Sequence, residues 1–188
     1  MPPKFRFTRR EVIDAALAVT CESGLSSLTA RTLAARLGAS SKTIFGLFEN
    51  MEEVQSEVRR AAGELYRTYI REDTASGRYP PYKASGMAYI RFARERRELF
   101  RLLFMCDRTD EDVSRPTKEL TDAVAVLRQA TGLGEEDALR FHLETWIFVH
   151  GIATMIATGY LNWDEALVSR MLTDEFEGLK SRYCKGGK

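Results

Sequence analysis

The sequence predicts an all-α protein of about nine helices, divided into a three-helix N-terminal domain and a larger helical bundle. Apolar residues recur at three- and four-residue spacing in every periodic segment of the 188-residue chain. Helix start signals precede several of these segments, as with Thr8 followed by Glu11 and Asn50 followed by Glu53. No alternation of apolar and polar residues bounded by hairpin turns is found. Helices therefore account for the whole predicted fold.

The composition narrows the class of protein before any motif is considered. A chain with 44% hydrophobic and 29% charged residues suits one or two folded domains. Three widely spaced cysteines and two histidines fit neither a disulfide scaffold nor a zinc site, so we expect no metal and no cofactor. The most apolar run, residues 146–161, is shorter than the ~20 residues of a membrane span, and the N-terminus lacks the apolar core of a signal peptide. We therefore expect a cytoplasmic protein that makes no membrane contact.

The first predicted helix opens with a capping box. Thr8 stands at the N-cap and Glu11 follows three residues later, an arrangement in which each side chain accepts a hydrogen bond from a free backbone N–H near the other residue. Gly24 is expected to end the helix. Its predicted buried face consists of Val12, Ile13, Ala16, Leu17 and Thr20.

Residues 29–48 are predicted to form two short helices joined at a glycine. Thr29 is a suitable N-cap for the first helix, and Gly38 supplies the left-handed residue that ends it. Ser40 is expected to cap the second helix. The predicted buried side of the second helix consists of Ile44, Leu47 and Phe48. Two helices connected in this way form a helix-turn-helix.

The second helix of this motif begins with the polar residues Ser41, Lys42 and Thr43. Small and basic polar groups at a helix N-terminus suit the DNA major groove, where first-turn residues meet base edges and the helix dipole meets phosphate. Seven Lys or Arg and three Asp or Glu precede residue 49, a local charge of +4 on a chain of net charge +1. The motif therefore predicts contact with double-stranded DNA.

The rest of the chain is predicted to contain six further helices. A Pro- and Gly-containing stretch at 74–81 separates the first two of them, and Gly132 and Gly134 break the chain before the last two. The expected ranges are 51–73, 82–94, 96–105, 116–129, 135–158 and 163–182.

The predicted helix 135–158 is apolar on two sides, which a helix at a protein surface is not. One side consists of Ala138, Phe141, Thr145, Val149, Ile152 and Ile156. The other consists of Leu139, Leu143, Trp146, Ile147 and His150. The chain's own core covers one side, and a second copy of the chain is the simplest cover for the other. We therefore expect a homodimer formed through the last two helices.

The N-terminal region resembles the TetR family of bacterial transcriptional repressors. The similar residues are the Thr8–Glu11 opening, Gly24, Thr29, Leu33-Ala34, Leu37-Gly38, Ser40, Thr43-Ile44, Phe45 and Phe48. In the C-terminal part, residues 97–104 and the Trp146 and His150-Gly151 pattern are similar to one domain type of the family. The resemblance implies a DNA-binding domain at 1–50 and a ligand-binding and dimerisation domain at 51–188. It also implies a repressor that leaves a palindromic operator when a small, largely apolar effector binds.

Positions that contact DNA in the family carry over to this chain residue by residue. Arg31 is the best candidate for a base or phosphate contact, since an arginine clasps a guanine with two hydrogen bonds. The other implied contacts are Arg6, Thr29, Ser41, Lys42, Thr43 and Phe45. A structural role remains open for each: Arg31 as a solvated surface charge, and the hydroxyl residues as helix caps.

The chain departs from the family pattern at three positions. Phe45 stands where the family usually has a phosphate-binding tyrosine, Met51 where lysine is common, and Leu47 where a polar residue is frequent. Each departure removes a contact to the DNA backbone, which supplies much of the affinity. Either other basic residues compensate, or operator binding is weak. The remaining alternative is a dimeric ligand-binding or protein-interaction module of the same fold that has lost operator binding.

The effector is expected to bind among aromatic side chains of the C-terminal domain, because ligand sites are largely apolar with few polar groups. The candidates are Tyr66, Tyr69, Tyr89, Phe100, Phe104, Trp146 and His150. His150 is alternatively a hydrogen-bonded core residue. No nucleophile has a neighbouring base signature and no Gly-rich phosphate loop is present, so we expect no catalytic residue and no enzyme.

Overall fold

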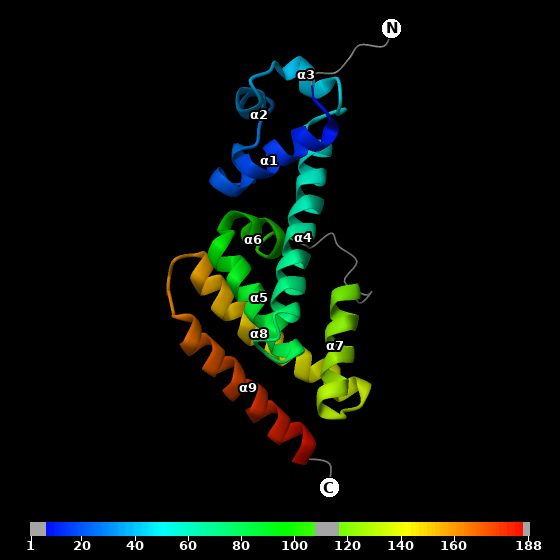
Figure 1. Ribbon diagram of the computed structural model, residues 1–188, viewed down its shortest axis with the longest axis vertical. Coiled ribbons are helices and arrows are strands. Elements are labelled where there is room, and N and C mark those ends of the chain that lie inside the picture. Colours follow the sequence, from blue (N-terminus) through cyan, green and yellow to red (C-terminus); the bar gives the residue numbers. More distant parts are fainter. Residues whose placement is uncertain (1–6, 108–116, 186–188) are drawn as a thin grey trace. The chain divides into compact units, whose positions relative to one another are not determined.

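The computed structural model describes residues 7–107 and 117–185, and within these ranges it contains helices and no strands. The all-α prediction is therefore confirmed (Figure 1). Nine α-helices and one 3₁₀ turn lie in the described part of the chain. They are α1 (Arg9–Ser23), η1 (Leu25–Ser27), α2 (Ala30–Leu37), α3 (Ser41–Phe45), α4 (Met51–Ala75), α5 (Pro81–Glu95), α6 (Arg97–Phe104), α7 (Lys118–Thr131), α8 (Glu135–Ala157) and α9 (Glu165–Lys185).

Local signals in the sequence account for most helix ends. The capping box of Thr8 and Glu11 is present, with a 3.2 Å hydrogen bond from the Glu11 N–H to the Thr8 hydroxyl. The Glu53 N–H donates to the Asn50 side chain at 2.8 Å, so Asn50 caps α4 as predicted. The expected start of α7 at residue 116 lies outside the described residues. The described helix has Thr117 as its N-cap.

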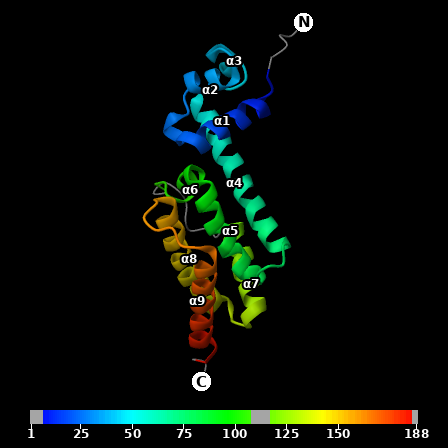
Figure 2. The ribbon, with the colours of Figure 1, turned by 60° about the vertical axis from the view of Figure 1, so that its left-hand side comes forward.

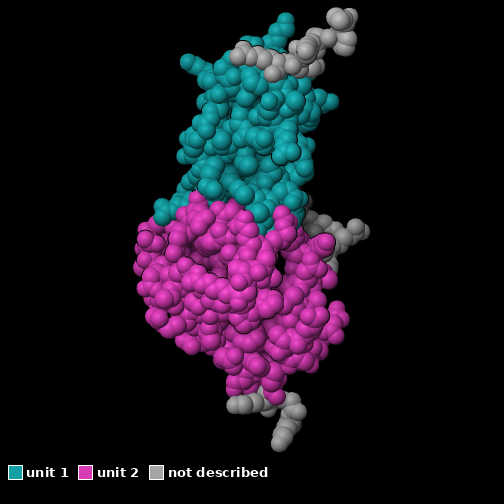
Figure 3. All heavy atoms as spheres, in the orientation of Figure 1, with its two compact units in different colours: residues 1–68, 96–106 teal, residues 69–95, 107–188 magenta. Residues whose placement is uncertain are grey.

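The chain folds into two compact units, residues 1–68 with 96–106 and residues 69–95 with 107–188 (Figure 3). We call them unit 1 and unit 2. The continuous helix α4 contributes its first part to unit 1 and its last part to unit 2. The predicted boundary at residue 50 concerns which residues bind DNA, and packing does not test that. It stays a prediction.

Unit 1 is built around α1, which packs against α2 and α6, while α2 packs against α3. Val12, Leu33, Ile44 and Leu99 are completely buried, one from each of these four helices. Gly24 ends α1 with φ +78°, a conformation that favours glycine. A Cβ atom at Gly24 would also lie 3.0 Å from the Glu98 carboxylate, which is the flexible end of that side chain, so the backbone conformation is the ground that requires glycine.

Unit 2 is organised by α5 and α8, which lie side by side (Figures 1 and 2), with α7 and α9 packed against α8. Phe141 on α8 is fully buried, and its ring lies 5.3 Å from that of Phe176 on α9. The buried residues of this core are Leu127, Ala138, Phe141 and Leu179. In the described ranges no helix combines the length and the apolar character needed to cross a lipid bilayer.

Candidate functional site

The helix-turn-helix lies in unit 1 and is formed by α2 and α3. The Thr29 hydroxyl accepts a hydrogen bond from the Thr32 N–H at 3.1 Å, which confirms Thr29 as an N-cap. Thr32 donates its own hydroxyl to the Ser27 carbonyl at 2.7 Å. Gly38 ends α2 with φ +58° and ψ +41°, the left-handed conformation that the sequence predicted. The connection between the two helices is therefore determined by local chemistry.

The second helix differs from the prediction in its cap and its length. Ser40 occupies the N-cap position, yet its side chain makes no capping hydrogen bond and lies 3.3 Å from the Thr43 hydroxyl instead. The expected side-chain cap is therefore wrong. Helix α3 ends at Phe45, so Leu47 and Phe48 lie in the turn that follows it. Phe48 is still buried, because backbone hydrogen bonds from Leu47 and Phe48 to the Ile44 carbonyl continue the chain's curvature.

The sequence-predicted DNA contacts differ in how open they are to solvent. Arg31 and Lys42 are exposed, whereas Ser41 and Thr43 are half-buried. Thr29 is exposed, but its hydroxyl is engaged with Thr32. The remaining two candidates are Phe45, whose residue is 47% exposed, and Arg6, which lies outside the described residues. Contact with DNA stays a prediction for all seven.

Basic residues near the motif fall into two groups according to their partners. Arg36 on α2 donates to both oxygens of Glu22 on α1, at 2.5 and 2.8 Å, and these bonds lower the pKa of the Glu22 carboxyl. Arg31 on the same helix has no ion pair among the described residues, and neither has Lys42 on α3. These two cations are therefore open to an anion from outside the chain.

Arg9 has a structural contact that the sequence did not reveal. Its guanidinium donates to the Leu47 carbonyl and to the Glu53 carboxylate, both at 2.6 Å, and stacks 4.2 Å from the centre of the Phe48 ring. The bond from Arg9, with a second one from the Glu49 N–H, lowers the pKa of Glu53. Arg9 thereby ties the start of α1 to the junction of α3 and α4. The partners lie 38 and 44 residues away in sequence, so local patterns carry no signal for them.

The seven residues predicted to bind an effector are divided between the two units. In unit 1, the ring of Phe104 lies 5.1 Å from that of Tyr66 and 5.3 Å from that of Phe100. In unit 2, Tyr69 packs edge-on against Phe92 at 5.2 Å. A second group in unit 2 joins α5 to α8 and consists of Tyr89, Trp146 and His150. Their role in ligand binding stays a prediction.

This second group of unit 2 is a polar and aromatic contact on the surface of α8. The Tyr89 hydroxyl lies 2.8 Å from Nδ1 of His150, and the indole of Trp146 stacks on the imidazole with 5.1 Å between ring centres. Tyr82 and His142 make a matching contact two turns earlier, at 3.0 Å. Burial lowers the pKa of both histidines and raises that of Tyr82 to about 12. The lowered pKa values favour the neutral form of both histidines.

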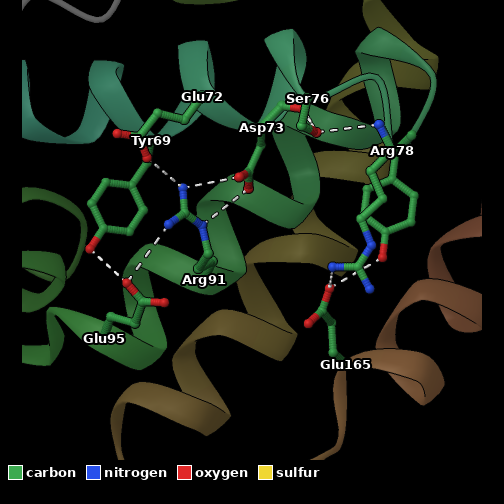
Figure 4. Close-up of polar contacts among 9 residues, drawn as sticks. Tyr69, Glu72, Asp73, Ser76, Arg78, Arg91, Glu95 and Glu165 are labelled. Atoms are coloured by element: carbon green, nitrogen blue, oxygen red, sulfur yellow. Dashed lines mark hydrogen bonds and ion pairs between the residues drawn. The ribbon is translucent and has the colours of Figure 1, made fainter.

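A cavity of about 150 Å³ lies in unit 2 between the end of α4, one face of α5 and the first turn of α9. Arg91 projects from α5 into a group of three carboxylates, those of Glu72, Asp73 and Glu95 (Figure 4). The Tyr69 hydroxyl donates to Glu95 at 2.8 Å, and the Arg91 guanidinium lies 4.1 Å from the centre of the Tyr69 ring. Burial alone would lower the pKa of Arg91, but these carboxylates raise it. No sequence pattern predicts this cavity, since its walls come from three distant segments.

Helix α8 carries an exposed apolar stripe on the side away from the core of unit 2. Leu139, Leu143, Trp146 and Ile147 follow one another at helical spacing, and Ile147 is 65% exposed. The opposite side, which includes Phe141, Val149 and Ile152, is buried. The two-sided pattern predicted for this helix is therefore confirmed. A contiguous apolar surface of this kind is typical of a protein–protein interface.

No group of three or more His, Cys, Asp or Glu side chains in residues 7–107 and 117–185 is arranged to hold a metal ion. The described candidates offer basic, hydroxyl and aromatic groups on unit 1, and a charged cavity and an apolar stripe on unit 2. Each of these is a candidate binding surface.

Comparison with known proteins places these features in a family. Residues 82–175 match the family described as "Tetracyclin repressor-like, C-terminal domain". The chain is also 22% identical over 188 residues to an uncharacterized HTH-type transcriptional regulator of Mycobacterium tuberculosis (strain ATCC 25618 / H37Rv), in an alignment covering 97% of this chain and 86% of that protein. The family match covers most of α5, all of α6, α7 and α8, and the first half of α9, which include the apolar stripe and the α5 and α9 walls of the cavity.

Proposed function

The chain belongs to the TetR family of DNA-binding transcriptional regulators, and from this premise we propose that it is a homodimeric repressor released from DNA by a small molecule. Two recognition helices related by a two-fold axis would read a palindromic operator, with half-sites about one helical turn apart or somewhat more. The observation that carries the proposal is the pair of exposed cations, Arg31 on α2 and Lys42 on α3, which have no ion pair among the described residues.

The proposed chemistry on DNA divides between these two residues. Arg31 reaches a guanine or a phosphate with two hydrogen bonds, a contact worth about 1–3 kcal/mol of discrimination when it is to a base. Lys42 supplies a point charge to phosphate, which adds affinity that salt weakens. Ser41 and Thr43 stand beside Lys42 on the same helix and complete the polar surface.

The second copy is proposed to cover the apolar stripe of α8, with α9 contributing to the same interface. Leu139, Leu143, Trp146 and Ile147 supply a continuous apolar surface for it. A two-fold axis places the same stripe against itself, so one sequence provides both halves of the interface. The proposed dimer carries two helix-turn-helix motifs, one for each half of the operator.

The link between effector and operator is proposed to run through α4, which is one continuous helix contributing to both units. An effector that binds more tightly to a conformation of the dimer that does not fit the operator shifts the dimer toward that conformation, and the dimer leaves the DNA. By reciprocity the operator weakens effector binding by the same factor, typically about 1–3 kcal/mol of coupling free energy.

A salt series on the DNA flanking the protein's own gene tests the proposal. We expect a specific complex at low salt whose log affinity falls linearly with log salt concentration. Arg31→Ala and Lys42→Ala should each weaken that complex. Absence of any specific complex at low salt would refute the repressor proposal. Wild-type affinity in both variants would refute the assignment of the contacts.

The exposed Phe45 favours a second candidate function. At this position of α3 it presents an apolar ring, 47% exposed, that cannot donate a hydrogen bond to phosphate. Met51 and Leu47 likewise offer no charge. A dimeric ligand-binding or protein-interaction module of the same fold would tolerate all three. Dimerisation and ligand binding without specific DNA binding, in the same salt series, would favour this function.

A further inference from the structure

We propose that the cavity of unit 2 binds a small carboxylate with an apolar body, and that Arg94 is the residue that receives the carboxylate group. The inference rests on the proposed function only in making this ligand the effector. Binding itself follows from the cavity's own residues. None of the residues predicted from the sequence to bind an effector lines this cavity, whose lining includes Arg94, Arg91 and Arg78.

The cavity's first wall is one face of α5. Met87, Ile90, Arg91 and Arg94 recur at intervals of three, one and three residues, so all four side chains lie along the same side of the helix. Met87 and Ile90 are buried, and Val168 of α9 faces the same space and is completely buried. The lining therefore has an apolar floor beside two guanidinium groups.

The charges around the cavity are almost all neutralised by one another. Arg91 Nη2 lies 3.0 Å from Asp73 and 3.1 Å from Glu72, and its Nε donates to Asp73 at 3.3 Å. Its Nη1 lies 3.8 Å from Glu95. Every nitrogen of the Arg91 guanidinium thus already faces a carboxylate. Arg91 is in place to hold the wall together rather than to bind a ligand (Figure 4).

The third arginine, Arg78, is likewise paired. It lies 2.6 Å from Glu165 at the start of α9, and the Tyr79 hydroxyl donates to the same carboxylate at 3.2 Å. Both Arg78 and Glu165 are largely exposed, so this ion pair holds the 76–80 connection to α9 only weakly and is screened by salt. A contact of this strength allows the connection to open for a ligand.

Arg94 is different from its two neighbours. One of its terminal nitrogens donates to the Trp163 carbonyl at 2.6 Å, and its Nε is buried with no hydrogen-bond partner. Among residues 7–107 and 117–185 no carboxylate forms an ion pair with it. A buried donor without an acceptor is costly, and a charged one more so. A ligand carboxylate in the cavity supplies the missing negative charge to the Arg94 guanidinium, in the planar geometry that a guanidinium matches.

The size and floor of the cavity select the rest of the ligand. A volume of about 150 Å³ suits a molecule of benzoate or hexanoate size rather than a polycyclic compound. Its apolar body would lie on Met87, Ile90 and Val168 while its carboxylate meets Arg94. The predicted ligand is therefore small and amphipathic, with one negative charge.

Calorimetric titration and thermal unfolding of the purified full chain test the site without DNA. The test ligands are benzoate and hexanoate, the uncharged benzamide and hexanamide, and hexylamine. We expect a carboxylate to bind and raise the Tm, while its amide at the same concentration does not. Arg94→Met should weaken carboxylate binding by about tenfold or more, which corresponds to about 1.4 kcal/mol. Arg60→Met, which removes an exposed arginine of unit 1, should leave binding unchanged.

A second measurement covers the case in which Arg94→Met fails to fold, which circular dichroism would detect. Arg94→Lys keeps the positive charge and a donor for the Trp163 carbonyl, but it has no Nε–H group. The arginine Nε–H signal that is missing from the NMR spectrum of this variant is therefore the signal of Arg94. The Nε–H signal of Arg94 should shift on addition of benzoate and not of benzamide.

Four results would overturn the inference: no binding of either carboxylate, equal binding of the amides, preference for hexylamine, or equal affinity in the Arg94 variants. Binding that depends on Arg94 but leaves the DNA complex unchanged would support the site and remove its role as effector site. A specific DNA complex together with no carboxylate binding would overturn the site and leave the proposed regulator intact.

Discussion

Arginines on α2 of unit 1 and on α5 of unit 2 show the same contrast in different settings. On α2, Arg36 is neutralised by Glu22, whereas Arg31 is exposed without an ion pair. On α5, Arg91 is surrounded by three carboxylates, whereas Arg94 is partly buried with an unpartnered nitrogen. In each unit one guanidinium is ion-paired within the chain, and a neighbouring one, which we propose binds an anion from outside, is not. We propose that ion pairing separates structural from functional arginines in this protein.

The two units also differ in what the unpaired cation can recognise. Arg31 lies on an open surface, where solvent and salt screen its charge and only a polyanion such as DNA binds well. Arg94 lines a partly open cavity with an apolar floor, where we propose that a single carboxylate suffices because water competes less. The environment of the guanidinium, rather than the residue type, determines the class of ligand.

The largest expected effect is on dimerisation and concerns the apolar stripe of α8 in unit 2. Leu143→Glu combined with Ile147→Glu should raise the dimer dissociation constant by about a hundredfold or more, because like charges would face each other across the two-fold axis. Sedimentation velocity measures the change. Thr158→Glu, an exposed position at the end of α8, serves as the control. A double variant that stays dimeric would place the interface elsewhere.

The second prediction tests the contrast on α2. Arg31→Ala should weaken a specific DNA complex by about 1–3 kcal/mol if it contacts a base. Arg36→Ala should change affinity by less, since Glu22 already neutralises its charge. Fluorescence anisotropy at one fixed salt concentration compares the two variants. Equal losses would show that pairing does not distinguish structural from functional arginines here.

The third prediction concerns two neighbouring arginines of α1. Arg9→Met should lower the free energy of unfolding by about 1 kcal/mol, because it removes the hydrogen bond to the Leu47 carbonyl and the stacking on Phe48. Arg10→Met should be nearly neutral, since its only ion pair in the described chain is a 3.8 Å contact to Asp14 on the exposed face. Urea unfolding distinguishes them. A larger loss with Arg10→Met would contradict the structural role of Arg9.

The smallest effect is a pH dependence of stability that arises from two histidines of unit 2. Burial lowers the pKa of His142 and His150 below 6.5, so the unfolded chain binds more protons than the folded one. The two histidines contribute fully to the free energy of unfolding above about pH 6.5. This contribution is lost as the pH falls through their lowered pKa values in the folded chain. Urea unfolding at about pH 7.5 and about pH 5.5 measures the loss. The double variant His142→Gln and His150→Gln should reduce it, and an unchanged loss would assign it to other groups.

The sequence predicted the parts of the site that depend on neighbours along the chain. Thr29, Gly38 and Asn50 act within a few residues of themselves, through caps and a left-handed turn, and all three are as expected. Ser40 is the exception, because its hydroxyl has a nearby alternative partner in Thr43 and the pattern does not show which one it takes.

The sequence alone determined the helices, their approximate ends, the two-sided character of α8 and the family resemblance, because helical periodicity and capping act over one or two turns. Only the tertiary structure decided which charges are neutralised. Arg9 meets Glu53 across 44 residues and Arg36 meets Glu22 across 14, while the cavity combines α4, α5 and α9. Ion pairs and cavities depend on distances in space between segments far apart in the chain. The same residue type is therefore structural at Arg91 and available for a ligand at Arg94.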